Sequence, residues 1–316
     1  MKKALEKYTT AFTSLNVGRV GDHLRPHKPV LLLAVLDLIE SGRISDNRIE
    51  LSPELLEHFG RYFEVVRATD DKPTPINPFF HLRGDKFWHH KPHPGMEQAY
   101  QTMKSPGGTR ALNEVIDCAT LDDELHDILQ VRDYRETLRK AIIERYFPGH
   151  RERLLEIIRE EREIGGYEQI LEHSLDDKSL LKDTLAPQEP IRNAAFRRVV
   201  VIAYDYRCAA CGLRIILADG PTIVDAAHII PFRESRDDDP RNGMALCKNH
   251  HWAMDRNLIA PGTDHAWHVS GSLDDRLEGQ RDLLSLQKRT IILPREAKYH
   301  PKQEALAWRQ RNLIRS

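Results

Sequence analysis

Two pairs of soft metal ligands constrain the fold of this chain more than any other feature. Cys208 and Cys211 are separated by two residues, and the same spacing recurs between Cys247 and His250. Thiolate and imidazole ligands in two short-spaced pairs are what a closed, tetrahedral zinc site requires. We therefore expect these four residues to bind a structural zinc ion that holds the segments between them together.

The remaining cysteine and the distribution of apolar residues indicate the cellular compartment of the protein. Cys118 is the one cysteine outside the ligand pairs, so no pair remains for a disulfide framework, and we expect Cys118 to be a small buried residue. No apolar run approaches the roughly 20 residues that cross a bilayer, and the first residues lack the apolar core of a signal peptide. These features predict a cytoplasmic protein without membrane contact.

The length of the chain indicates how many domains it has, and its charge indicates which partners it can bind. A chain of 316 residues is long enough for about two domains. Its formal net charge is −1, whereas proteins that bind nucleic acids are more often basic overall. Any contact with DNA would therefore depend on local basic patches.

The first half of the chain has the pattern of a helical domain with a small sheet. Residues 28–40 are apolar on nearly all sides, and Pro29 stands where a first helical turn tolerates proline, which predicts a buried central helix. A second helix is expected after Ser52, a candidate N-cap. Residues 78–90 alternate around 83–85, which predicts a β-hairpin. Helix, helix and hairpin in this order indicate a winged-helix-like domain.

Periodicity and breakers place the boundary between the two domains. Helical patterns are expected in 111–131 and 133–147, and a charged amphipathic segment follows in 150–163. Periodicity then fades, and glycines and prolines appear. We predict an α+β protein with a first domain, a linker and a second domain at 1–162, 163–190 and 191–316.

The second domain is expected to wrap short elements around the zinc ion. A helix in 194–206 leads into the first cysteine pair, 223–230 has the pattern of a strand, and 250–255 that of a short helix. The segment 233–241 mixes arginines with three consecutive aspartates. Its arginines could grip phosphates, but its composition is typical of a solvated loop.

Four motifs of this domain occur in a specific order. They are Cys208-Ala-Ala-Cys211, Asp225-Ala-Ala-His228-Ile-Ile-Pro231, Arg241-Asn242-Gly243 and Cys247-Lys-Asn-His250-His251-Trp-Ala-Met-Asp255. Together they resemble an HNH endonuclease of the ββα-metal type, in the branch with a structural zinc. The resemblance implies hydrolysis of phosphodiester bonds with a catalytic divalent ion, Mg²⁺ or Mn²⁺.

The residue types suit this chemistry independently of the resemblance. A neutral imidazole can activate water near pH 7, and His228 is the candidate base. His251, beside zinc ligand His250, could bind the divalent ion that neutralises charge on the phosphate. Asp225 lies three residues before His228, so a strand would point it to the opposite face, which suits metal binding rather than proton transfer. Many family members carry an acid where this chain has Ala227, which makes His251 the better candidate ligand.

Asn242 matches the central asparagine of the HNH family. The resemblance implies that its amide holds the catalytic histidine or the adjoining loop by hydrogen bonds. The alternative is that Asn242-Gly243 only forms a turn, since this dipeptide favours positive φ angles. For His228 and His251 the alternative is a structural role in a zinc module that binds DNA without cutting it.

Two segments of the first domain, 24–33 and 77–82, resemble the DNA sulfur-binding domain of phosphorothioate-dependent type IV restriction enzymes. That family also carries an HNH domain near the C-terminus. The likeness implies that two groups of residues contact modified DNA. His27 and Lys28, assisted by Arg25, would meet the backbone phosphate at a helix N-terminus, and Asn77, Pro78 and His81 would line a shallow sulfur pocket. Alternatively, Pro29 only starts the helix and His27 only caps it.

The sequence thus predicts a modification-dependent restriction endonuclease that reads phosphorothioate-modified double-stranded DNA. Double-strand cutting with one active site per chain would favour a homodimer, although successive nicking would also suffice. Two alternatives remain open. The first domain could read methylated or unmodified DNA, or the whole chain could be a non-catalytic zinc DNA-binding protein.

Overall fold

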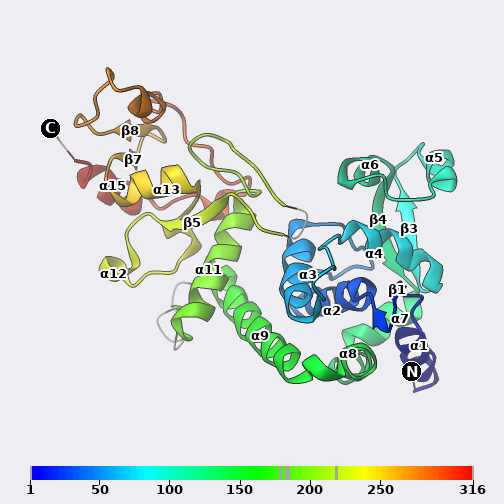
Figure 1. Ribbon diagram of the computed structural model, residues 1–316. Coiled ribbons are helices and arrows are strands. Elements are labelled where there is room, and N and C mark those ends of the chain that lie inside the picture. The colour runs from blue at the N-terminus through cyan, green and yellow to red at the C-terminus, as the bar shows by residue number, and fades with distance from the viewer. Residues whose placement is uncertain (1, 178–179, 182–185, 218–219, 315–316) are drawn as a thin grey trace. The chain divides into compact units, whose positions relative to one another are not determined.

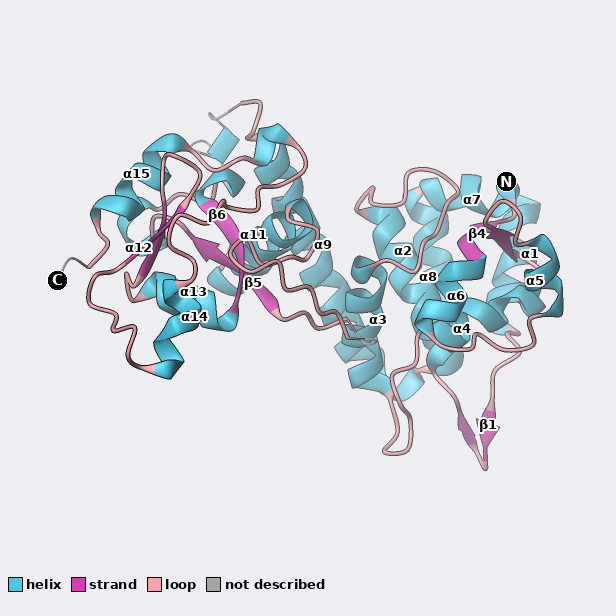
Figure 2. Cartoon of the chain, turned by 90° about the horizontal axis from the view of Figure 1, so that it is seen from above, coloured by secondary structure: helices cyan, strands magenta, loops and turns pink. Residues whose placement is uncertain are grey.

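A computed structural model describes residues 2–177, 180–181, 186–217 and 220–314 (Figure 1). Within these ranges, helices, cyan in Figure 2, make up most of the regular structure. The strands form two-stranded antiparallel sheets. The predicted α+β class is confirmed. None of the helices in the described ranges combines the length and the apolar character that crossing a membrane demands.

The chain divides into two compact units. The first comprises Met1–Arg162 with Leu217–Pro221, and the second comprises Glu163–Ile216 with Thr222–Ser316. Helix α9, Arg151–His173, begins in the first unit and ends in the second.

Of the expected linker at 163–190, residues 163–173 are helical, and residues 178–179 and 182–185 lie outside those that the structure describes. Gly165 and Gly166 do not break α9, although each glycine costs a helix about 1 kcal/mol. Ile164, Tyr167 and Leu171 recur at helical spacing and are all buried in the second core. Packing of this face outweighs the intrinsic cost of the glycines.

Helix α2, His27–Glu40, is the centre of the first core. All of its residues from Lys28 to Ile39 are buried, as expected from a sequence that is apolar on nearly all sides. It packs against α3, Pro53–Val66, and α8, Arg132–Tyr146. The hydroxyl of Ser52 accepts a hydrogen bond from the Leu55 amide at 3.2 Å, which confirms the predicted N-cap of α3.

The predicted hairpin at 78–90 is wrong. Residues Ile76–His81 form helix α4, and a 3₁₀ turn, Leu82–Asp85, follows it. The adjacent Phe79 and Phe80 are both buried, which a helix on the core permits and an alternating strand does not.

The strand that follows pairs elsewhere. Strand β3, Trp88–Pro92, pairs antiparallel with β4, Ile116–Leu121. The helix expected over 111–131 is therefore also wrong in its middle, because β4 separates α6, Thr109–Val115, from α7, Asp123–Gln130. Cys118 lies in β4 and is buried, as predicted.

The smaller elements of the first unit complete its surface. They are α1, Lys2–Thr13; β1, Arg19–Val20, paired with β2, His23–Leu24; α5, Glu97–Thr102; and a 3₁₀ turn, Pro148–His150.

The second unit is built on a two-stranded sheet between two helices. Strand β5, Val224–His228, pairs antiparallel with β6, Gly243–Cys247, in a register that sets His228 opposite Gly243. Helix α11, Glu189–Ala203, packs on both strands, and α13, Lys248–Asp255, follows β6 directly. The helix, strand and short helix expected at 194–206, 223–230 and 250–255 are confirmed.

Gly243 lets α11 approach the sheet closely. A Cβ atom on Gly243 would lie 2.5 Å from Cγ2 of Val200 and 2.8 Å from the ring of Phe196. Both side chains belong to the buried core, so a larger residue would push α11 away from the end of β5.

The remaining elements of the second unit surround this centre. They are α12, Phe232–Ser235; β7, Ile259–Pro261, paired with β8, Trp267–Val269; α14, Arg281–Leu284; α15, Gln303–Arg311; and 3₁₀ turns at Pro240–Asn242, Glu278–Gln280 and Ala297–Tyr299.

Candidate active site and metal centre

The four predicted zinc ligands form one cluster. The ligand atoms of Cys208, Cys211, Cys247 and His250 all lie within 4.8 Å of one another. Nδ1 of His250 is 3.0 Å from Sγ of Cys247 and 3.5 Å from Sγ of Cys208. Three thiols and one imidazole are a donor set that a structural zinc ion takes in tetrahedral geometry.

Local backbone geometry presents the ligands. The first two cysteines flank a tight turn, in which the Gly212 amide donates to the Cys208 carbonyl at 2.8 Å and Gly212 adopts a φ of +76°. That φ lies in the left-handed region, which favours glycine. Cys247 ends β6 and caps α13, and His250 lies on the first turn of that helix. A zinc ion held there ties the turn to the β6–α13 junction.

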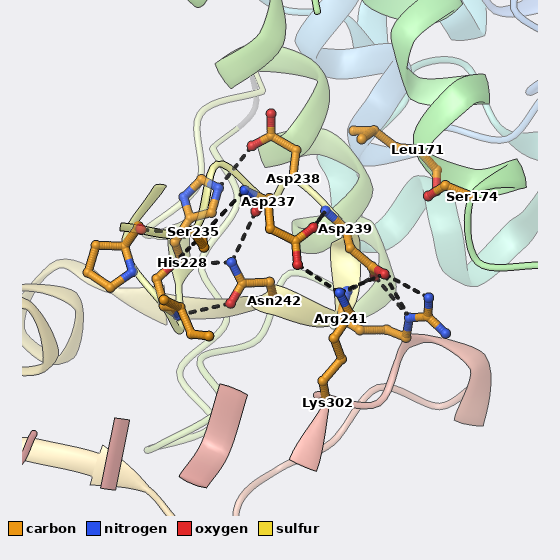
Figure 3. Close-up of polar contacts among 12 residues, drawn as sticks. Leu171, Ser174, His228, Ser235, Asp237, Asp238, Asp239, Arg241, Asn242 and Lys302 are labelled. Atoms are coloured by element: carbon orange, nitrogen blue, oxygen red, sulfur yellow. Dashed lines mark hydrogen bonds and ion pairs between the residues drawn. The ribbon is translucent and has the colours of Figure 1, made fainter. Parts of the chain in front are cut away.

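His228, the candidate base, is the last residue of β5. Its ring stacks on Phe196 with centroids 3.9 Å apart and planes 5° apart. Its Nε2 atom lies 3.0 Å from Oδ1 of Asp238. Figure 3 shows the ring directed towards this carboxylate. The side chain is 18% exposed, so part of it remains accessible to solvent. Stacking and the hydrogen bond together fix the plane and the rotation of the imidazole.

Asp238 was missed by the sequence analysis, which interpreted 233–241 as a solvated loop. The structure corrects that interpretation, because Asp238 is 4% exposed and its neighbour Asp239 is 2% exposed. Nη1 of Arg192 donates to both carboxylate oxygens of Asp238, at 2.8 and 2.9 Å. The Tyr167 hydroxyl lies 3.4 Å from Oδ2 of Asp238. Burial and the charge of Asp238 raise the pKa of Tyr167 to about 12, so the hydroxyl keeps its proton.

One sequence signal pointed to this buried pair. Arg192 shares a helix face with Ala195, Phe196 and Val199, and all four are buried. A charged residue on an apolar helix face requires a partner of opposite charge in the core. Asp238 is that partner.

Asn242 holds the loop that carries Asp238. Its amide nitrogen donates to the carbonyls of Ile230 at 3.1 Å and Asp237 at 3.0 Å, and its amide oxygen accepts from the Ile230 amide at 2.9 Å (Figure 3). Gly243 has a φ of −117° and begins β6, so Asn242-Gly243 is not a turn with positive φ angles. Asn242, at one end of the loop, is thus hydrogen-bonded to Ile230 at the other end.

His251 and Asp225, the candidate ligands of the catalytic ion, have different surroundings. His251 lies on α13 with Nε2 3.6 Å from Oδ2 of Asp255. Asp225 lies on β5, is half exposed, and pairs with Nε of Arg197 at 3.3 Å. Among the described residues, the zinc quartet is the one group of three or more acidic, cysteine or histidine side chains close enough to hold an ion. A second cation would therefore need water or phosphate oxygens in addition to these side chains.

Arg309 of α15, also missed by the sequence analysis, connects β5 to α13. Its guanidinium donates to the carbonyls of Ile229 at 2.6 Å, His228 at 3.1 Å and Met254 at 3.1 Å. The side chain is 1% exposed, and burial lowers its pKa to about 10, which leaves it charged at neutral pH. Arg309 thus fixes the end of the strand that carries His228 against the end of the helix that carries His251.

In the first unit, the residues that were predicted to contact phosphate interact with other residues of the protein. Nζ of Lys28 lies 2.5 Å from Oδ2 of Asp85, and both side chains are largely buried. Arg25 forms an ion pair with Asp71. Nε2 of His27 lies 2.9 Å from the carbonyl oxygen of Lys72, and burial lowers the pKa of His27.

The three predicted pocket residues all belong to α4. Asn77 and His81 are four residues apart and exposed, so they share one face, whereas Pro78 is buried. Partial burial and the charge of Lys28 lower the pKa of His81. The three residues are therefore divided, because Asn77 and His81 are exposed and Pro78 is buried.

Family models match both parts of the chain. Residues 208–260 match a family described as HNH endonuclease. Residues 6–162 match a family described as ScoMcrA-like, DNA sulfur-binding domain. The first unit is thus similar to a DNA sulfur-binding domain, and the second unit contains a segment similar to an HNH endonuclease.

The chain also has similarity to solved structures. A modification-dependent TagI restriction endonuclease is similar at 22% sequence identity and a TM-score of 0.29. The match covers 40% of this chain, which spans only 40% of that protein's length. No curated protein sequence matches the chain.

Proposed function

We propose that this protein is a type IV restriction endonuclease that recognises phosphorothioate-modified double-stranded DNA and hydrolyses phosphodiester bonds near the modification. The first unit reads the modification, and the second unit cuts with Mg²⁺ or Mn²⁺. The observation that carries the proposal is the fixed imidazole of His228, which stands at the end of β5 in an HNH domain.

Each catalytic residue has one task in this proposal. His228 takes a proton from water, the water oxygen attacks phosphorus in line, and the bond to the 3′ oxygen breaks, which leaves a 5′-phosphate end. Asn242 keeps the loop beside His228 in place through its three hydrogen bonds. His251 would hold the cation, with Asp225 as a second candidate. A divalent cation bound there supplies charge stabilisation for the phosphate and the leaving oxygen.

Recognition of sulfur is assigned to the surface around α4. Sulfur in place of a non-bridging oxygen is larger, softer and a poorer hydrogen-bond acceptor, so a shallow apolar hollow beside basic groups would favour it. Asn77 and His81 are exposed there, and Pro78 is a buried neighbour on the same helix. Lys28 and Arg25 would supply the positive charge for the adjacent phosphate. Because each is paired with an aspartate, a bound phosphate would share these cations with Asp85 and Asp71.

Cleavage of matched plasmids tests the proposal. The full chain is incubated with one plasmid prepared in phosphorothioate, methylated and unmodified forms, with Mn²⁺, Mg²⁺ or EDTA. We expect cutting of the phosphorothioate plasmid only, and only with a divalent cation. Equal cutting of all three plasmids would reject sulfur recognition. Tight binding without cutting under every metal condition would reject the nuclease and support a zinc DNA-binding protein.

Oligomeric state is a separate part of the proposal. One active site per chain cuts one strand at a time, so a double-strand break at a single site favours a homodimer on DNA. Sedimentation of the protein with a phosphorothioate duplex should give two chains per duplex. A one-to-one complex that still produces double-strand breaks would require successive nicking instead.

A further inference from the structure

We propose that Asp238, held by Arg192, is a positioning residue that keeps a proton on Nε2 of His228 and thereby makes Nδ1 the atom that accepts the proton from water. This inference rests on the proposed function, because it specifies how the base of the nuclease is set up. Neither Asp238 nor Arg192 belongs to the motifs by which the HNH domain is recognised in the sequence.

The hydrogen bond between His228 and Asp238 determines the tautomer. Nε2 of His228 lies 3.0 Å from Oδ1 of Asp238. An ionised carboxylate only accepts hydrogen bonds, so Nε2 must carry the proton and the lone pair of the neutral ring must be on Nδ1. Among the hydrogen bonds of the described residues, none engages Nδ1 of His228. That nitrogen is left for water.

The carboxylate of Asp238 is held in a buried ion pair with Arg192. Arg192 donates to both oxygens, and the side chains of Asp238 and Arg192 are 4% and 8% exposed. The guanidinium of Arg192 lies 3.6 Å from the centre of the Phe232 ring and donates to Oδ1 of Asn193 at 2.7 Å. A buried arginine with these contacts cannot turn away from the carboxylate without losing several of them. Asp238 therefore presents a fixed negative charge to the imidazole.

A purely structural role of Asp238 is the alternative. The same contacts join α9 through Tyr167, α11 through Arg192, and the loop before Asn242. If the role of Asp238 is only structural, any side chain that accepts hydrogen bonds from Arg192 could replace it. If Asp238 positions His228, the replacement must also accept the hydrogen bond from Nε2. The two roles differ in the tautomer of His228 and in the rate of the chemical step.

The next residue provides a matched control. Asp239 lies in the same loop, is 2% exposed and is paired with the cations of Arg241 and Lys302, at 2.7 and 2.9 Å. Asp239 is similarly buried and, like Asp238, is paired with cations. However, none of its hydrogen bonds involves His228. Figure 3 shows Asp239 directed towards Arg241 and Lys302. Asp239→Asn should therefore remove one buried, paired charge from the loop without changing the contacts of the imidazole.

The first measurement reads the tautomer directly. The zinc-loaded full chain is labelled with ¹⁵N-histidine, and the ring nitrogens of His228 are observed by long-range proton–nitrogen correlation at pH 8.5. The His228→Gln variant identifies the signal. We expect the Nε2–H tautomer in the wild-type protein and in Asp239→Asn. An Nδ1–H tautomer in the wild-type protein would overturn the proposal, whatever the variants do.

The second measurement separates chemistry from binding. Single-turnover cleavage of a phosphorothioate duplex at saturating Mn²⁺ should be about 10- to 100-fold slower in Asp238→Asn, since partners that orient a functional imidazole typically contribute that much. DNA affinity and zinc content should stay within twofold of wild type, and Asp239→Asn should cut within threefold of wild type. A folded Asp238→Asn protein that cuts at the wild-type rate would overturn the positioning role. If that variant does not fold, the tautomer of the wild-type protein decides.

Failure of this inference can be distinguished from failure of the proposed function. His228→Ala protein that cuts as fast as wild type would refute the base itself. Inactive His228→Ala protein together with fully active Asp238→Asn protein would refute the positioning residue alone.

Discussion

Replacing Arg309 with methionine should unfold the second unit at markedly lower urea concentration. The side chain is 1% exposed and donates to three main-chain carbonyls, at 2.6, 3.1 and 3.1 Å. A hydrogen bond from a charged donor contributes about 1.5–3 kcal/mol net, and the methionine stem retains part of the packing. Because the guanidinium also carries a desolvation cost, we expect a loss of about 3–5 kcal/mol rather than the full sum.

The assay must report on the second unit alone. Zinc-loaded full-length protein is equilibrated in urea and pulse-labelled with deuterium, and peptides from β5 and α13 are read by mass spectrometry. Arg311→Met, on the exposed face of the same helix, is the matched control and should change the unfolding free energy by less than about 0.5 kcal/mol. Equal midpoints for Arg309→Met and Arg311→Met would show that the three carbonyl contacts do not stabilise the site.

Three further predictions concern zinc, DNA and pH. Cys211→Ser should release zinc and unfold the second unit while the first unit stays folded. Metal analysis together with the same peptide assay checks this prediction. Full retention of zinc by the variant would contradict it. Lys28→Ala should weaken binding to phosphorothioate duplexes and reduce the slope of log affinity against log salt by about 0.9; an unchanged slope would exclude a phosphate contact. Burial lowers the pKa of His90 to about 4. The first unit should therefore lose stability as pH falls from about 6.5 towards 4, because the unfolded state binds the proton first. Urea midpoints should show this loss in wild type and in His150→Gln, an exposed control, but less of it in His90→Gln, and equal pH dependence in all three would refute the assignment.

The zinc cluster and the short elements around it could be predicted because their signals are local. Cys208 and Cys211, like Cys247 and His250, are near neighbours in the chain, so their spacing alone nearly determines how their side chains can converge. The buried helix α2 was equally predictable, because its apolar residues surround the helix axis. In each case the information lies within a few residues.

The errors in the first unit come from tertiary packing that a local pattern does not contain. Residues 78–90 alternate as a hairpin would, but β3 finds its partner in β4, which lies beyond α5 and α6. Burial of the adjacent rings of Phe79 and Phe80 then requires a helix. The glycines of α9 show the same effect in the second unit, where buried neighbours at helical spacing override local preference.

The residues missed at the site share one property. Arg192 and Arg309 lie far in sequence from the groups that they contact, so no motif spacing reveals them. Their signal was a charge on an apolar helix face: Arg309 follows the buried Ala305 and Leu306 by four and three residues. Such a position predicts a buried polar partner but does not say which one.

The most direct test of the central claim is the single-turnover cleavage rate of His228→Ala on a phosphorothioate duplex with Mn²⁺, measured at protein concentrations that saturate the DNA. We expect the rate to fall by at least about 100-fold, the lower range of what a general base contributes, with zinc content and duplex affinity unchanged. A His228→Ala protein that binds zinc and DNA normally and cuts at the wild-type rate would contradict the account.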